Sequence, residues 1–236
     1  MDDQRDITLD TVLQSVRRRW GSDAVQRLSS RRRATGARLS TGLSSLDDAL
    51  AGGLPNGRLA EICGTPTSGA STLALRLVAA AQTAGATAVW IDVSHALDAD
   101  YADHCDIDLD DLLLVRPANG RAALEIAGDL VSSRSADLIV VAPGLTPLEV
   151  PAGGWQKLAV RVAKSPTTLV MICPDGDRHS TDKSYVSLRL RVERTAWQWS
   201  GHTLRGWEAR VTVVKNKLGP VGQTAVFPVV LPERSS

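Results

Sequence analysis

Cysteine is scarce in this sequence, and the three that occur, Cys63, Cys105 and Cys173, lie far apart. Such spacing excludes the disulfide framework of small secreted domains and the paired cysteines of a structural zinc site. The four histidines show no metal-ligand spacing either, so no metal site is expected. Two of the cysteines lie in apolar, strand-like runs, and we expect them to be buried thiols in a reducing compartment.

Long apolar runs are also missing. No stretch approaches the roughly 20 apolar residues that a bilayer-spanning helix needs. The first residues, MDDQRDITLD, are polar and acidic rather than a secretory signal. A content of 43% hydrophobic and 22% charged residues is typical of a soluble globular protein. We therefore expect a cytoplasmic protein with no membrane contact.

Lysine is rare, since arginine supplies 22 of the 27 basic residues. Charge is unevenly spread: residues 17–38 hold eight arginines, residues 92–111 hold eight aspartates, and residues 189–217 hold seven basic side chains against two glutamates. Arginine runs either bind nucleic-acid phosphates with salt-dependent affinity or keep a surface solvated. The aspartate run likewise fits either a basic partner or a solvated loop.

The first 38 residues are predicted to form a segment apart from the core. The stretch ITLDTVLQSVRRRW carries apolar residues at helical spacing, namely Leu9, Val12, Leu13, Val16 and Trp20. A helix of about three turns is marginal alone in water, so this face packs either on its own core or on another protein. We favour docking on a partner, because Gly21 and the basic linker at residues 29–38 would let the helix reach outward.

Residues 39–236 are predicted to form one α/β core domain. Short apolar runs such as LAEICG, TAVWIDV, ADLIVVAPG and TTLVMICP alternate with stretches of helical periodicity. This alternation is typical of a mostly parallel sheet with helices on both faces. The tail changes to a period of two around Ser200 and Gly201, which predicts a C-terminal antiparallel hairpin followed by a last strand, TAVFPVVL.

The stretch GTPTSGAST at residues 64–72 follows a predicted strand and precedes a predicted helix. It fits the phosphate-binding P-loop, G-x-x-x-x-G-K-[ST], at every defined position except the lysine, where Ala70 stands. Such a loop holds phosphates with backbone N–H groups at a helix N-terminus. The candidate nucleotide site therefore includes the loop residues Gly64, Ser68, Gly69, Ser71 and Thr72.

Two further side chains that ATP hydrolysis needs are missing. The magnesium site needs a carboxylate at the end of a neighbouring strand, yet the strand LIVV ends in Ala142. A base that activates water is expected beyond VWIDV, yet Ser94 stands there. Because Ala70 also replaces the lysine, three roles are unfilled. We expect no catalytic residues and no ATPase activity.

These fragments together resemble the bacterial RecA family over roughly residues 9–232. The segments LSTGLSSLDDAL, TAVWIDVSHALDADYA, ADLIVVAPG and VTVVKNKLGPVGQTAVFPV are each similar to RecA segments. The resemblance implies a RecA-like P-loop core, with Asp98 and Tyr101 at adenine-contacting positions. It also implies that Lys215 and Lys217 stand where RecA lysines reach the ATP of a neighbouring subunit, although both could instead be solvated residues.

The departures from RecA point to a more specific resemblance. Two segments, LTPLEVPAGGWQKL and CPDGDRHSTDKS, are shorter than the family's DNA-binding loops, Pro174 replaces a nucleotide-sensing glutamine, and no RecA C-terminal domain is expected. A small RecA relative stripped of catalytic residues is similar to the ImuA accessory proteins. That resemblance implies binding to RecA or its filament, or to a polymerase-like ImuB-type protein, in damage-induced mutagenic translesion synthesis.

Two alternative functions stay open. The chain could bind single-stranded DNA through its arginine runs and tryptophans, or it could be an ATPase that another subunit completes. No cofactor is expected, although the retained loop leaves room for weak ATP binding.

The tail also predicts an exposed surface. Trp197 and Trp199 share strand parity with Arg189 and Arg191, whereas the apolar residues of the strand take the other face. Without a bulge, aromatic and cationic side chains lie together and favour a protein interface. With a bulge, both tryptophans turn into the core. The candidate partner-binding residues are therefore these two tryptophans, the N-terminal helix face and the lysines of the VKNK segment.

Overall fold

The computed structural model describes residues 37–144, 148–174 and 184–232. The predicted N-terminal helix lies outside the described residues, so its partner-binding face and the separate N-terminal segment stay predictions. Within the described ranges, no helix is long and apolar enough to span a bilayer.

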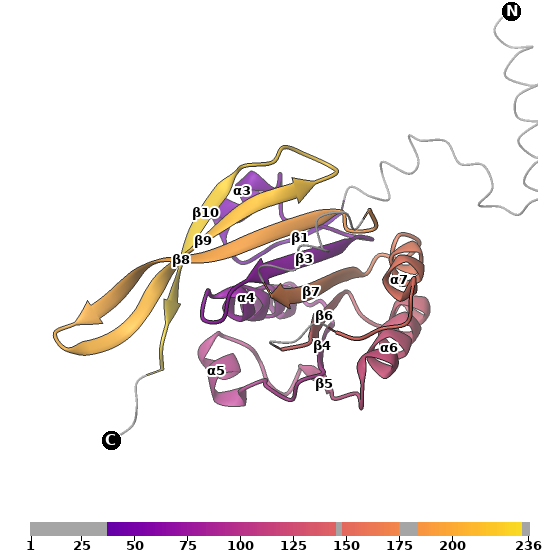
Figure 1. The fold of residues 1–236 in the computed structure, drawn as a ribbon, viewed down its shortest axis with the longest axis horizontal. Helices are drawn as coiled ribbons and strands as arrows, with labels where there is room; N and C mark the ends of the chain where they lie inside the picture. The colour runs from indigo at the N-terminus through magenta and orange to yellow at the C-terminus, as the bar shows by residue number, and fades with distance from the viewer. Residues whose placement is uncertain (1–36, 145–147, 175–183, 233–236) are drawn as a thin grey trace, which may run out of the picture. The chain divides into compact units, whose positions relative to one another are not determined.

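One eight-stranded sheet organises the core, in the order β10-β9-β8-β3-β7-β6-β4-β5 (Figure 1). Six strands run parallel: β8 (Leu188–Ser200), β3 (Leu59–Gly64), β7 (Thr168–Pro174), β6 (Leu138–Ala142), β4 (Ala88–Asp92) and β5 (Leu113–Val115). At one edge β9 (Thr203–Asn216) and β10 (Thr224–Val230) join in antiparallel pairing. A separate two-stranded sheet pairs β1 (Arg38–Leu39) with β2 (Leu54–Pro55). The predicted sheet and C-terminal hairpin are confirmed.

Helices cover both faces of the large sheet, and each face has its own apolar core. On one face, α4 (Ala70–Thr83) packs with α3 (Ser44–Ala49) and α5 (Ala99–His104) over buried residues that include Leu73 and Trp90. On the other face, α6 (Gly120–Ser133) and α7 (Gly154–Val162) cover a second cluster that includes Ile139. Strands β3, β4 and β6 are buried along their whole length. Their sequences are mostly apolar for this reason, apart from the buried Glu61 in β3 and Asp92 at the end of β4.

The C-terminal hairpin is partly core and partly projection. The first residues of β8 are mostly buried, whereas every residue from 193 to 200 is exposed. In Figure 1 this part of β8 and β9 extends beyond the rest of the sheet. Buried and exposed residues alternate strictly along β10, as the period of two in its sequence predicts.

The state of the cysteines corrects the sequence analysis. Cys63 and Cys173, predicted as thiols, are joined in a disulfide, with their Cα atoms 4.7 Å apart. The parallel pairing of β3 with β7 places the two residues in register, although 110 positions separate them along the chain. Sequence spacing could not reveal this bond, because the bond depends on which strands become neighbours. Cys105 is a free thiol.

Candidate functional site

The P-loop connects the carboxyl end of β3 to the N-terminus of α4. The Ser68 N–H donates to the Thr65 carbonyl at 3.0 Å, and the Ser68 hydroxyl accepts from the Ala70 N–H at 3.3 Å. A Cβ on Gly64 would lie 2.2 Å from the Ser68 hydroxyl oxygen. Gly69 has a φ of +102°, a conformation that favours glycine. The packing of the loop itself therefore requires both glycines of the motif.

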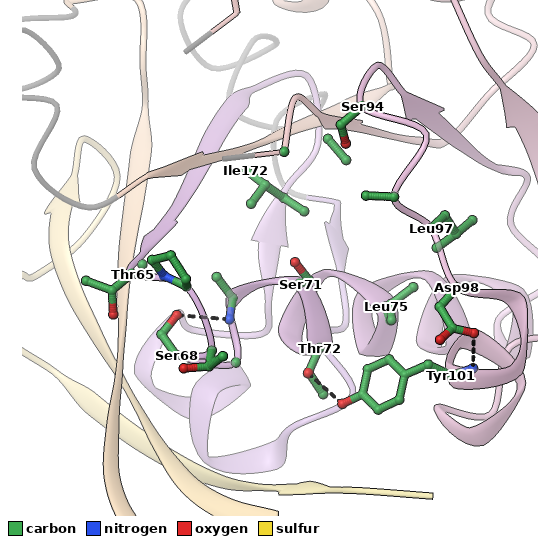
Figure 2. A pocket seen from close by; sticks show the side chains of 18 of the residues that line it. Thr65, Ser68, Ser71, Thr72, Leu75, Ser94, Leu97, Asp98, Tyr101 and Ile172 are labelled. Carbon is green, nitrogen blue, oxygen red and sulfur yellow. Dashed lines mark hydrogen bonds between the residues drawn. The ribbon is translucent and has the colours of Figure 1, made fainter. Parts of the chain in front are cut away.

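A pocket of about 520 Å³ opens over this loop (Figure 2). Every nucleotide-site residue predicted from the sequence lines it, namely Gly64, Ser68, Gly69, Ser71, Thr72, Asp98 and Tyr101. The three positions singled out as substituted, Ala70, Ser94 and Ala142, line the same pocket. They come from the start of α4, the turn after β4 and the end of β6. The structure thus brings both predicted sets of residues to one place.

The pocket wall has no basic side chain among the described lining residues. Its lining includes no lysine or arginine, and its charged side chains are the two carboxylates of Asp92 and Asp98. A nucleoside triphosphate is strongly negative. In this pocket its phosphates would meet backbone N–H groups and hydroxyls, but no lysine would offset their charge. The arrangement suits holding a ligand more than stabilising the charge that develops in phosphoryl transfer.

Asp92 is a site residue that the sequence analysis did not single out. It ends β4, is 1% exposed, and accepts hydrogen bonds from the N–H groups of Ala96 at 3.0 Å and Leu97 at 3.1 Å. Arg116 forms an ion pair with it at 3.4 Å. The carboxylate therefore fixes the turn that presents Ser94 to the pocket. A signal was available, because an aspartate inside an apolar strand run must find partners when it is buried.

The turns after β4 and β6 touch each other at the edge of the pocket. A Cβ on Gly144 would lie 2.6 Å from the Cβ of Ser94, and Gly144 has a φ of +81°. Ser94 is therefore packed against the neighbouring turn. Any side chain larger than glycine at position 144 would force the two turns apart.

Tyr101 and Thr72 bond to each other across the pocket. Their hydroxyl oxygens lie 2.8 Å apart, and Figure 2 shows Tyr101 reaching from α5 toward α4. Asp98 caps α5 by accepting the Tyr101 N–H at 3.1 Å. Burial raises the pKa of Tyr101, and the hydrogen bond with Thr72 only partly offsets this effect. Tyr101 is therefore a neutral hydrogen-bonding phenol at physiological pH.

The C-terminal hairpin forms another wall of the pocket. Trp207 of β9 lines the pocket, and a Cβ on Gly69 would lie 2.9 Å from a methyl carbon of Val229 in the adjoining last strand, β10. Arg194 of β8 also contacts the loop, where its Nη1 donates to the Thr67 hydroxyl at 2.7 Å. The P-loop thus rests on the hairpin.

Trp197 and Trp199 are exposed, as the sequence predicts, at 47% and 60%. Register shifts do occur in this part of β8, but they do not turn the tryptophans into the core. The Arg194 guanidinium stacks over the Trp197 ring at 4.0 Å, and Trp197 meets Trp207 edge-on at 5.8 Å. We call Arg194, Trp197 and Trp199 the hairpin tip. It combines aromatic and cationic side chains on one exposed surface.

Arg189 corrects the predicted composition of that surface. It is 7% exposed, and its Nη2 forms an ion pair with Glu61 at 2.6 Å. Here β8 lies inside the sheet and is covered on both faces, so a period of two no longer separates core from solvent. Arg191 is exposed, as predicted.

The two candidate lysines are not brought into the pocket. Neither Lys215 nor Lys217 is among the residues that line it. The Lys217 ammonium donates to the Ser184 carbonyl, and the Lys217 backbone N–H donates to the Ser187 carbonyl at 2.9 Å. Lys217 is therefore engaged within the chain. Contact of either lysine with a neighbouring subunit stays a prediction.

A parallel sheet in which one strand leads through a glycine loop into a helix N-terminus defines the P-loop class of nucleotide-binding folds. Residues 7–152 match the RecA N-terminal domain. The chain is 35% identical to Protein RecA of Thioalkalivibrio sulfidiphilus, over 99% of this chain and 78% of that relative. It is 37% identical to Protein RecA of Frankia alni, over 96% of this chain and 75% of that relative. The chain belongs to the RecA family.

A solved structure has the same fold. The crystal structure of the RadB recombinase is similar with a TM-score of 0.63, covering 81% of this chain and 96% of that chain at 20% identity. At this identity the likeness concerns the fold alone. The RecA-like core predicted from the sequence is confirmed, whereas the closer resemblance to ImuA belongs to the proposal below.

Proposed function

We propose that this chain is a non-catalytic accessory protein of DNA-damage tolerance, similar in kind to ImuA. It binds RecA, its filament or a polymerase-like ImuB-type partner, and it favours mutagenic translesion synthesis over recombination. The observation that carries the proposal is the meeting of Ala70, Ser94 and Ala142 on one pocket. The name of the relatives, Protein RecA, supports a role in DNA recombination and repair.

The charge of the pocket opposes ATP hydrolysis. P-loop enzymes offset phosphate charge with a lysine and a bound magnesium ion, and a further group orients the attacking nucleophile. Removing one preorganised contact of this kind typically slows turnover by about 10²–10³-fold. Here the side chains for three roles are missing, and the charged lining residues that the structure describes are carboxylates. We expect at most weak ATP binding through the loop amides.

The hairpin tip is the candidate partner surface. Tryptophan and arginine are the residues most enriched among energetically important interface contacts. Trp199 is 60% exposed, and Trp197 contacts both Arg194 and Trp207. A pre-positioned aromatic surface loses little side-chain entropy when a partner binds. These contacts favour protein docking at the tip.

The test is a titration of this chain into the single-strand-DNA-dependent ATPase of RecA. We expect inhibition at substoichiometric ratios, and inhibition about tenfold weaker for the double variant Trp197→Ala/Trp199→Ala. Val160→Ala is the matched control, because Val160 is 58% exposed on α7, away from the hairpin. A chain lacking residues 1–38 tests the N-terminal helix in the same assay.

Three results would redirect the proposal. No inhibition at equimolar or higher ratios contradicts docking on RecA and leaves the polymerase-like partner. Inhibition that excess single-stranded DNA abolishes, with steep salt dependence, favours the DNA-binding alternative. Equal inhibition by the tip variant and the Val160 variant removes the tip from the interface.

A further inference from the structure

We propose that Cys63 and Cys173 form a reversible dithiol–disulfide site, whose reaction partners are small thiols and disulfides that enter through the pocket. The inference goes beyond the proposed function, which assigns no chemistry to either cysteine. It rests on three observations: the pairing of the two residues, the access to one of them, and their place beside the P-loop.

The pairing holds the two sulfurs together in either redox state. Cys63 and Cys173 are directly opposed in the ladder between β3 and β7, and their Cα distance of 4.7 Å lies within the range that a disulfide needs. Hydrogen bonds of the sheet fix this neighbourhood, so the bond can open and close without unfolding. The third cysteine, Cys105, lies at the end of α5 and is free.

Access differs between the two sulfurs. Cys173 lines the pocket, whereas Cys63 is not among the lining residues, and both are nearly buried, at 6% and 5% exposure. A pocket of about 520 Å³ has the size of sites that hold small organic ligands. A small thiol therefore reaches Cys173 first, and a bulky reagent reaches neither sulfur in the folded chain.

The exchange balances without any further reactant. In oxidation, the Cys173 thiolate attacks a small disulfide RSSR, forms a mixed disulfide and releases one RS⁻. The Cys63 thiolate then attacks the Cys173 sulfur, closes the Cys63–Cys173 bond and releases the second RS⁻. The two protons of the cysteines end on two RSH molecules, and two electrons pass from the protein to RSSR. Reduction is the reverse, and it begins with attack of RS⁻ on Cys173.

A metal site is the competing use of the same residues. A carboxylate oxygen of Glu61 and the sulfurs of Cys63 and Cys173 all lie within 4.8 Å of one another. However, Arg189 already holds Glu61 at 2.6 Å, and the two sulfurs are bonded to each other.

Cys63 also directly precedes Gly64, the first residue of the P-loop. The disulfide therefore ties the strand that begins the loop to β7.

The experiment equilibrates the full chain in glutathione buffers of stepped redox ratio, followed by acid quenching, alkylation and peptide mass mapping. We expect one reversible transition in which Cys63 and Cys173 become linked while Cys105 stays alkylatable. Cys63→Ala should accumulate glutathione on Cys173, because the resolving thiol is missing. Cys173→Ala should react at Cys63 at least about tenfold more slowly. Cys105→Ser is the control and should titrate like the wild type.

Several results would overturn the proposal. One is the absence of the Cys63–Cys173 link in fully oxidised glutathione. Another is equal reactivity of Cys63 and Cys173 in the paired variants, with far-UV circular dichroism confirming that both fold. A third is exchange that proceeds only at the rate of global unfolding, measured on the wild-type chain in a urea series. Zinc bound between the two thiols that blocks their oxidation would also contradict it.

Discussion

The buried ion pair of Glu61 and Arg189 joins the neighbouring strands β3 and β8. The Nη2 and Nε atoms of Arg189 lie 2.6 and 2.7 Å from Glu61 Oε2, and the two side chains are 8% and 0% exposed. Removing one partner leaves an uncompensated buried charge, which typically costs about 3–5 kcal/mol. We expect Arg189→Met to lower the free energy of unfolding in urea by about that amount.

The matched control for this pair is an exposed one. Arg121→Met breaks a solvent-facing contact with Glu125, formed at 2.9 Å on α6, and should leave the free energy of unfolding unchanged. The double variant Glu61→Gln/Arg189→Met should recover much of the loss, because no buried charge is left unpaired. An Arg189 variant as stable as the Arg121 variant would argue against a buried pair.

The raised pKa of Tyr101 predicts that the folding stability of the chain depends on pH. Burial raises this pKa above the ordinary value of 10.0, which the unfolded chain retains. Above that ordinary pKa, the unfolded state binds fewer protons than the folded state. The stability contributed by Tyr101 is therefore complete below pH 10 and is lost as pH rises through the raised pKa.

The measurement is the free energy of unfolding as a function of pH, for the chain with Tyr101 and for the Tyr101→Phe variant. Tyr101→Phe should flatten the decline in unfolding free energy above about pH 10. Burial also raises the pKa of Cys105, so both chains carry Cys105→Ser. Tyrosinate absorbance isolates the group, because Tyr185 is the only other tyrosine. Identical alkaline profiles for the two chains would rule out the raised pKa.

Among the elements, the C-terminal hairpin contacts the P-loop in part through Arg194 of β8. Arg194→Gln removes the stacking on Trp197 and weakens the bond to Thr67. Both contacts are exposed, so global stability should fall by no more than about 1 kcal/mol. Hydrogen exchange should instead accelerate locally, in residues 195–204. Arg210→Gln, an exposed change elsewhere on β9, should leave that exchange unchanged, and equal effects of both variants would contradict the contact.

The sequence predicts individual elements better than their pairing. The strands LAEICG, AVWID and LIVVA could be predicted because burial on both faces favours mostly apolar runs. The glycine loop marked the start of α4, and the period of two marked the hairpin. The Cys63–Cys173 bond and the burial of Arg189 could not be predicted, since both depend on the order of strands in the sheet.

For the whole molecule, the parallel sheet explains why the site could be assembled from the sequence alone. The carboxyl ends of parallel strands lie at one edge, where such folds bind ligands, so the ends of β3, β4 and β6 had to meet there. Ala70, Ser94 and Ala142 follow or close these strands and line one pocket. Of the two carboxylates of that wall, Asp98 was predicted from the resemblance to RecA, whereas Asp92 was not singled out, although a buried aspartate in an apolar strand run must find partners.

Phosphate release from ATP by the purified chain tests whether this pocket hydrolyses ATP. The assay uses magnesium and ATP, with and without single-stranded DNA, and compares the wild type with Ser71→Ala. We expect a rate at the buffer background that the substitution leaves unchanged. Sustained turnover that Ser71→Ala abolishes would contradict it and would make the chain a working ATPase of the RecA family.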